Sequence, residues 1–153
     1  MVKPTQADMR ISLEDARFFY EKLAPIVRGS EQQQDHERIR RYFRAYLHCW
    51  KCVLHFVREV KGLKGERWSG WCERWARQLD PSDSELFKCL RETRDHDTHC
   101  AIIELKGEIA GGLFPIVMFL PGKDSGHPRE LISCCERGLF VAEHLIRVYP
   151  SVC

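Results

Sequence analysis

Residues 35–61 read DHERIRRYFRAYLHCWKCVLHFVREVK, and this stretch decides the fold. Its apolar side chains recur at steps of mostly three and four residues, which is the period of one face of an α-helix. They are Ile39, Tyr42, Phe43, Tyr46, Leu47, Trp50, Val53, Leu54, Val57 and Val60. The spacing predicts a long amphipathic helix that ends at Gly62 and buries one face in a core.

The other face of this predicted helix is basic. It carries Arg41, Arg44 and Lys51, with Arg38 at its edge. A face of this kind is either solvated or in contact with an anionic polymer such as RNA, and the pattern leaves both interpretations open. If the face binds RNA, its candidate residues are Arg38, Arg41 and Arg44.

Two shorter helical patterns lie on either side of this helix. Towards the N-terminus, Ser12 followed by Asp15 predicts an N-cap with an acidic first turn, and an apolar stripe then continues to Val27. Towards the C-terminus, the tryptophans at positions 68, 71 and 75 predict a third helix. Tryptophans at this spacing are more typical of core packing than of a surface on which bases stack.

The second half of the chain begins with a helix and then changes its periodicity. Pro81 predicts the start of a fourth helix that runs into the segment 91–99, and beyond His99 residues 101–105 and 113–120 form two apolar runs of strand length. Pro128 suits the first turn of a last helix. The sequence therefore predicts an all-α fold: one domain, residues 1–153, built as a four- to five-helix bundle with a small β-hairpin or irregular insertion before the last helix.

The composition limits the classes of protein to which the chain can belong. Its net charge of +2 means that binding to an acidic polymer needs a local basic patch. No apolar run reaches the roughly 18 residues that a membrane span requires. The N-terminal residues lack the apolar core of a signal peptide, so the expected location is the cytoplasm, away from membranes.

The eight cysteines do not predict a disulfide framework, because the chain has enough apolar residues for a core and lacks a secretion signal. Cys49 and Cys52 form a CxxC pair inside the long helix. A structural zinc site needs a second pair of ligands at a characteristic spacing, and the sequence offers none. We expect free thiols, no metal and no cofactor; a zinc or redox protein is the alternative.

The segment RETRDHDTH (91–99) concentrates the residues that carry chemistry. Cleavage at a phosphate without a metal needs a cation to hold the anion and an imidazole to move a proton, and Arg94 and His99 supply both. Asp95 lies four residues before His99, so on a helix it would orient the imidazole. The same residues are also explained by capping and ion pairing at a helix end.

One helix alone does not bring Arg94 and His99 to the same atom. Five residues turn an ideal α-helix by about 140° beyond a full turn, which separates the two side chains around its axis. Either the helix ends between them, or a second copy of the motif completes the site across a dimer.

The six residues RDHDTH (94–99) resemble the motif of the HEPN superfamily, in which an Arg is followed by Asn, Asp or His, three further residues and a His. The long helix with FRAYL (43–47), the tryptophan-rich segment and Leu86-Phe87 shortly before the motif agree with the layout of uncharacterised bacterial members. The resemblance covers most of the chain loosely, and only the six-residue motif is specific.

This resemblance implies a bundle of four or five helices, frequent homodimerisation and, in many members, metal-independent RNA cleavage. By the same resemblance, His99 is the general acid and base, Arg94 clamps the phosphate and Asp95 holds the arrangement. His96 is a candidate RNA-binding residue, with a second proton carrier or a solvent-facing histidine as the alternatives. The expected function is a HEPN-type endoribonuclease, with a toxin or defence role and an antitoxin partner as one setting. The alternative is a non-catalytic dimeric module that binds nucleotide, RNA or a protein partner.

Overall fold

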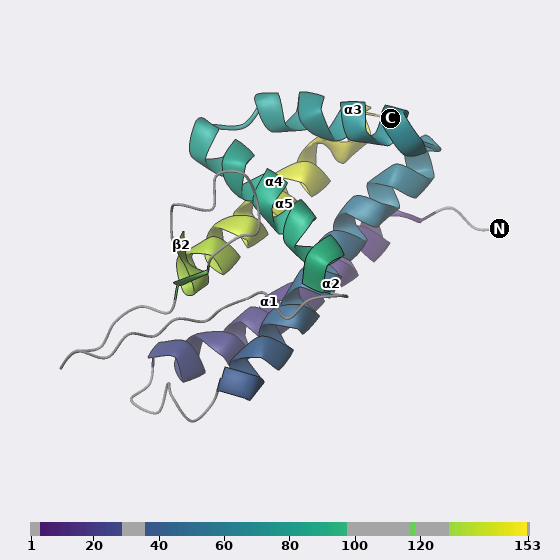
Figure 1. Cartoon of the computed structure of the whole chain (residues 1–153). Helices are drawn as coiled ribbons and strands as arrows, with labels where there is room; N and C mark the ends of the chain where they lie inside the picture. The colour runs from purple at the N-terminus through teal and green to yellow at the C-terminus, as the bar shows by residue number, and fades with distance from the viewer. Residues whose placement is uncertain (1–3, 29–35, 98–116, 119–128, 153) are drawn as a thin grey trace.

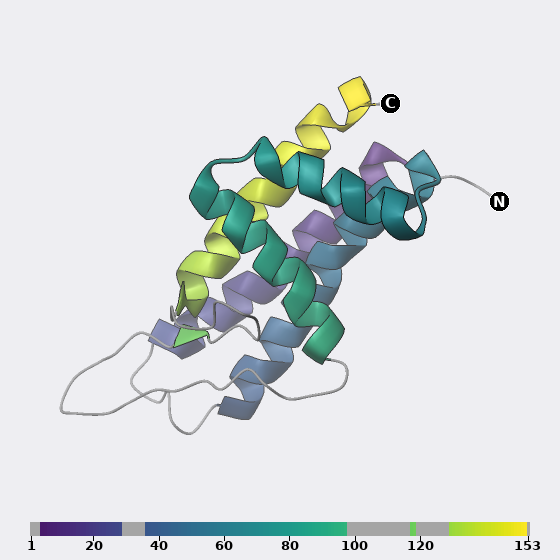
Figure 2. The same cartoon turned by 45° about the horizontal axis from the view of Figure 1, so that its top comes forward.

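The computed structural model describes residues 4–28, 36–97, 117–118 and 129–152. Within these ranges the chain forms five helices: α1 (Gln6–Arg28), α2 (His36–Lys61), α3 (Gly65–Arg77), α4 (Pro81–Asp97) and α5 (Leu131–Val152). Figure 1 shows α1 and α2 running antiparallel along each other, with α4 and α5 packed on them. The second view shows α3 lying across one end of this bundle (Figure 2). The prediction of an all-helical bundle is confirmed.

The apolar stripe of α2 forms the centre of the core, as its spacing predicts. Eight of its ten predicted positions are buried, and Tyr42 and Val60 are partly buried against the same core. The largest fully buried side chains are Trp50, Tyr46, Phe43 and Phe87. Because burying an aromatic side chain removes 150–250 Å² from water, roughly, these residues account for much of the stability of the fold.

The start of α1 differs from the prediction. The helix begins at Gln6, one and a half turns before Ser12, and the cap is formed by Thr5 and Asp8. The Thr5 backbone N–H donates to Asp8 Oδ2 at 2.6 Å, and the Asp8 N–H donates back to Thr5 Oγ1 at 3.3 Å. Both pairs, at 5/8 and 12/15, fit the pattern of a capping box. The earlier pair forms the cap because Met9 is also buried, which extends the apolar stripe by one turn.

Replacing Asp8 by asparagine is expected to lower the melting temperature by about 3 °C at neutral pH. The hydrogen bond from the Thr5 backbone lowers the pKa of the Asp8 carboxyl. The stabilisation is therefore fully present above the ordinary carboxyl pKa of about 3.9 and is lost as the pH falls through the lowered value. Thermal melts at neutral and acidic pH measure this difference; Glu21→Gln, in the same helix but away from the cap, is the control. An Asp8→Asn difference that grew in acid would contradict the assignment.

Helix α2 ends at a glycine, as its sequence predicts. Gly62 adopts a φ of 62°, in the left-handed region that favours glycine. The Leu63 N–H donates to the Arg58 carbonyl at 3.1 Å and the Gly62 N–H to the Glu59 carbonyl at 3.2 Å, which is the Schellman pattern. This turn directs the chain into α3, whose three tryptophans pack against the core and stack on one another.

Helix α5 is joined to α2 by hydrogen bonds inside the core and to α4 by an ion pair at the edge of the core. Tyr46 Oη donates to the Cys135 carbonyl at 2.8 Å, and Trp50 Nε1 donates to the Gly138 carbonyl at 2.9 Å. The Arg137 guanidinium binds the buried Asp83 carboxylate of α4 through two hydrogen bonds, of 2.6 and 2.7 Å. These contacts fix the position of α5 along the bundle axis relative to α2 and to α4.

The predicted insertion is only partly within the described residues. Strands β1 (Val117–Met118) and β2 (Arg129–Glu130) pair antiparallel, with Val117 opposite Glu130. The predicted hairpin between residues 101–105 and 113–120 is not seen in the described part, and apart from Val117 and Met118 both runs lie outside it. The last helix also begins later than predicted: Arg129 and Glu130 belong to β2, so α5 starts at Leu131 rather than near Pro128.

No helix in the described ranges combines the length and the apolar content that a membrane span needs.

Candidate functional site

Four residues of the predicted motif, Arg94, Asp95, His96 and Asp97, form the last turn of α4. Their side chains and the whole of His99 lie outside the residues that the structure describes, so the predicted contact between Asp95 and His99 also lies outside them. The backbone nevertheless places the first four motif residues, because α4 is helical as far as Asp97.

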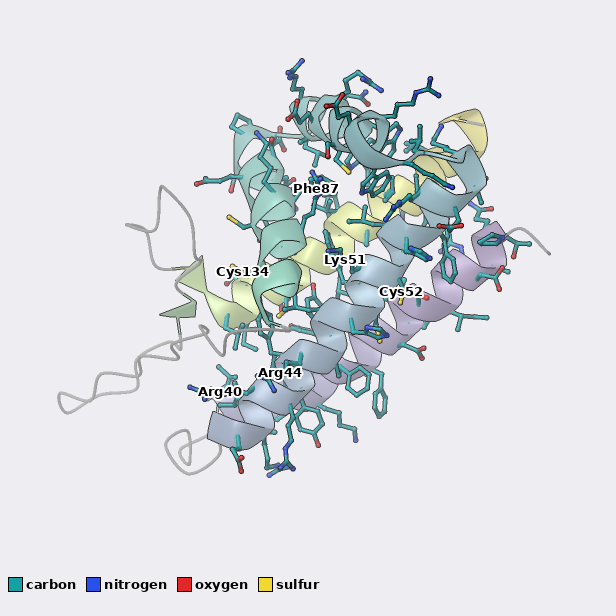
Figure 3. The ribbon with its side chains drawn as sticks, turned by 45° about the vertical axis from the view of Figure 1, so that its right-hand side comes forward. Arg40, Arg44, Lys51, Cys52, Phe87 and Cys134 are labelled. Carbon is teal, nitrogen blue, oxygen red and sulfur yellow. The ribbon has the colours of Figure 1, made fainter. Side chains whose placement is uncertain are left out.

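The core holds α4 in place ahead of the motif. Leu86, Phe87 and Leu90 are buried, as the sequence predicts, and the Phe87 ring packs edge-on against the Trp50 ring of α2 with 6.0 Å between centroids. Figure 3 shows Phe87 directed inward from α4. This packing therefore fixes the direction in which the motif-bearing end of α4 points.

One helical turn before Arg94, α4 contacts both α2 and α3. Lys51 Nζ donates to the Arg91 carbonyl and Arg91 Nη2 to Ser69 Oγ, each at 3.5 Å, the long limit of a hydrogen bond. Burial raises the pKa of the nearby Cys72 thiol to about 11, and the positive charges of Arg91 and Lys51 act against that rise. Two cations therefore lie close together where the motif-bearing end of α4 meets α2 and α3.

The contact made by Lys51 identifies the edge of α2 that faces α4. On an ideal helix, Arg44 lies within about 20° of Lys51, Arg41 about 80° away and Arg38 about 140° away. All three arginines are exposed. The structure therefore brings Arg44 to the α4-facing edge, whereas Arg41 and Arg38 lie progressively farther from it. Each of the three arginines is a surface neighbour of the next, and their role in RNA binding stays a prediction.

Arg40 is a residue that the sequence pattern does not single out. This residue lies four positions before Arg44 and, like it, within about 20° of Lys51 around the helix. The Arg40 Nε atom is buried and has no hydrogen-bond partner among the described residues. Arg40 is next to Ile39 in the sequence, at the border of the apolar stripe. Its spacings, four residues to Arg44 and eleven to Lys51, are nevertheless visible in the sequence. Figure 3 shows the three side chains along α2.

The CxxC pair lies on α2 and is half-buried. Burial raises the pKa of the Cys49 thiol to about 11, so this thiol is protonated at neutral pH. Cys52 Sγ lies 3.9 Å from His48 Nε2, one turn earlier in the helix. In the described part of the chain, no three His, Cys, Asp or Glu side chains come together in a way that could hold a metal ion.

A separate pocket of about 640 Å³ opens between the first turns of α4 and α5. It is lined by Ser82, Leu86, Ser133, Cys134, Glu136, Arg137 and Phe140. The Arg137 charge in this pocket is already matched by Asp83, and its guanidinium lies 4.1 Å from the centroid of the Phe140 ring. The described lining contains none of Arg38, Arg41 and Arg44.

Comparisons with models of protein families, with curated proteins and with solved structures gave no match.

Proposed function

We propose that this protein is a metal-independent endoribonuclease of the HEPN type, with Arg94, Asp95 and His99 as its catalytic residues. The observation that supports the proposal is the position of the motif-bearing end of α4 beside a cationic edge of α2, where Lys51 contacts the Arg91 carbonyl. A phosphodiester at this end of α4 would lie near the positive charges of Lys51 and Arg91, which favour an anion and the charge that develops on it.

The proposed reaction is a transesterification within the RNA backbone. The ribose 2′-oxygen attacks the adjacent phosphorus in line while the bond to the 5′-oxygen breaks. His99 takes the proton from the 2′-hydroxyl and returns a proton to the leaving 5′-oxygen, and Arg94 stabilises the phosphorane-like charge. Asp95 holds the imidazole in the productive tautomer. The products are a 2′,3′-cyclic phosphate and a 5′-hydroxyl, so atoms and charge balance without a metal.

Incubation of the purified chain with end-labelled RNA in EDTA tests this proposal. We expect cleavage to continue in EDTA and the new 3′ ends to be cyclic phosphates, because the protein side chains supply both the proton transfer and the charge stabilisation. Linear 3′-hydroxyl ends, or cleavage that stops when EDTA is added, would contradict the proposed mechanism.

A specific observation favours the second candidate, a dimeric module that binds nucleotide, RNA or a protein partner without turnover. Ile11 and Phe18 are 61% and 51% exposed although both are large and apolar. They are seven residues apart on α1 and therefore share one face of the helix. Such a face suits a protein interface. Sedimentation of the wild type and of an Ile11→Asp, Phe18→Asp variant tests it: a smaller species only in the variant supports a dimer that uses this face.

A further inference from the structure

We propose that the exposed face of α5 is an RNA-binding surface, which holds one base of a single strand against Phe140, the next base against His144 and a phosphate at Arg147. The inference rests on the proposed function for the choice of RNA as the ligand. The surface shares no residue with the motif. Ser82, which lines the pocket beside Phe140, lies about 18 Å before Arg94 along the axis of α4.

Four side chains of α5 form this surface, which we call the α5 surface. Arg137, Phe140, His144 and Arg147 follow one another at steps of three and four residues, so they share one face of the helix. All four are exposed. Two aromatic rings therefore lie between two arginines, and this combination of stacking groups and cations is typical of surfaces that bind single-stranded nucleic acid.

The Phe140 ring is held in place and is open to a ligand. The guanidinium carbon of Arg137 lies 4.1 Å from the ring centroid and covers one face of the ring, and Asp83 holds that guanidinium through two hydrogen bonds. Phe140 is nevertheless 56% exposed. The exposed area therefore includes the other face of the ring, which is where a base would stack.

The pocket beside Phe140 suits a base rather than a phosphate. Its volume of about 640 Å³ lies within the range of small-ligand sites, roughly 300–1,000 Å³, and the buried side chains of Leu86 and Cys134 line it. The charge of Arg137 is matched by its ion pair, and Glu136 adds a negative charge to the lining. These charges favour a neutral ring in the pocket and disfavour a phosphate.

His144 offers a second stacking position one turn later in α5. Its imidazole stacks on the indole of Trp75, with 5.4 Å between the centroids and 29° between the planes. Trp75 is buried and stacks in turn on Trp71, so the imidazole lies on a support that the core holds in place. Side chains four residues apart on a helix have their Cβ atoms about 5–6 Å apart, so neighbouring bases of one strand can stack on Phe140 and His144.

The positive charge of the α5 surface lies at its Arg147 end. Arg147 Nε lies 3.4 Å from Glu143 Oε1, and Arg10 Nη1 of α1 lies 3.2 Å from the same oxygen. One carboxylate therefore faces two guanidinium groups, which leaves one positive charge in excess in this cluster. The Arg147 side chain is 71% exposed, so a phosphate can reach it. The charges thus orient the strand, with a base in the pocket and a phosphate at Arg147.

Binding of a fluorescein-labelled, 2′-O-methylated oligoadenylate tests the α5 surface, because this strand cannot undergo attack by a 2′-hydroxyl and adenine offers a large ring for stacking. Phe140→Ala is expected to bind about tenfold more weakly, within the range found when one base-stacking aromatic is removed. Phe140→Trp keeps an aromatic ring and is expected to bind at least as tightly as the wild type. Arg147→Gln is expected to lower the slope of log K against log salt by about 0.7, the contribution of one phosphate contact with a single strand.

The matched control for Phe140 is Phe18, an exposed phenylalanine of α1 that also has a cation over its ring, Lys22 at 5.3 Å. Phe18→Ala is expected to bind with nearly the wild-type affinity. The control for Arg147 is Arg67→Gln, which removes an exposed arginine of α3 and should leave the salt slope unchanged. Equal losses in the two phenylalanine variants, equal slopes in the two arginine variants, or no binding by the wild type would overturn the proposal. Thermal melts confirm that each variant is folded.

Cleavage of unmodified RNA, measured in parallel, separates this proposal from the nuclease. A wild type that cuts RNA while Phe140→Ala binds and cuts equally well keeps the nuclease and removes the α5 surface. A wild type that does not cut, but loses binding in Phe140→Ala and not in Phe18→Ala, keeps the α5 surface and removes the nuclease.

Discussion

Replacing His99 by alanine is expected to reduce the rate of RNA cleavage by about 10²–10⁴-fold, the range that general acid–base catalysis contributes. The imidazole is the proposed group that removes the 2′-hydroxyl proton and protonates the leaving oxygen, and alanine can do neither. Arg94→Ala is expected to cost about 10²–10³-fold, the range measured when a group that stabilises transition-state charge is removed. Single-turnover cleavage of end-labelled RNA measures both rates.

The control for His99 is another histidine of the same chain. His55 is exposed on α2, and its Nε2 atom lies 3.8 Å from Glu59 Oε1. We expect His55→Ala to cut RNA at the wild-type rate. Cleavage that survives His99→Ala, or that falls equally in both variants, would remove His99 from the mechanism. His96→Ala is informative as a third variant, since a loss of binding without a loss of single-turnover rate would place His96 on the RNA-binding surface.

Replacing Gly138 by alanine is expected to destabilise the fold by about 2 kcal/mol, because overpacking of a core costs about 1–3 kcal/mol and alanine recovers less than that in helix propensity. An added Cβ would lie 2.9 Å from Leu90 Cδ1 and would also collide with Tyr46 Oη. The hydroxyl has no easy alternative, since it is buried and donates to the Cys135 carbonyl. Thermal or urea unfolding measures the loss, with an expected decrease in melting temperature of about 6 °C.

Two further variants make this prediction specific. Gly70→Ala is the matched control: its Cβ would meet only the flexible end of Arg74, at 3.3 Å, so helix propensity should leave it neutral or slightly stabilising. Tyr46→Phe, made in the Gly138→Ala background, removes the colliding oxygen and is expected to restore part of the lost stability. If both glycine variants unfold alike, the close approach of α5 to α2 is not the cause.

Local patterns in the sequence predict the helices, because the information lies within a few residues. The stripe of α2, its end at Gly62 and the start of α4 at Pro81 depend on periodicity and on the conformational limits of glycine and proline. The same patterns predict the first cap at Ser12 rather than at Thr5, because two capping boxes occur in one segment. Only the burial of Met9 in the assembled core decides between them.

Contacts between distant segments are what the sequence does not predict. Gly138 is unremarkable in a helical pattern, and only the positions of Tyr46 and Leu90 show why a side chain does not fit there. Arg40 is a second example. Its neighbours in the sequence suggest a solvated cation at the border of the core, whereas the contact between Lys51 and Arg91 shows that this edge of α2 faces α4.

The ion pair between Asp83 and Arg137 has a consequence for the evolutionary history of the chain. Its two members lie 54 residues apart in sequence. The Asp83 side chain is only 7% exposed, and a buried carboxylate without its partner destabilises the folded state. Loss of either residue alone is therefore unfavourable. Related sequences should therefore exchange the two residues together or keep both. An acid in the first turn of the fourth helix that covaries with an arginine in the second turn of the last would mark descent from a common ancestor.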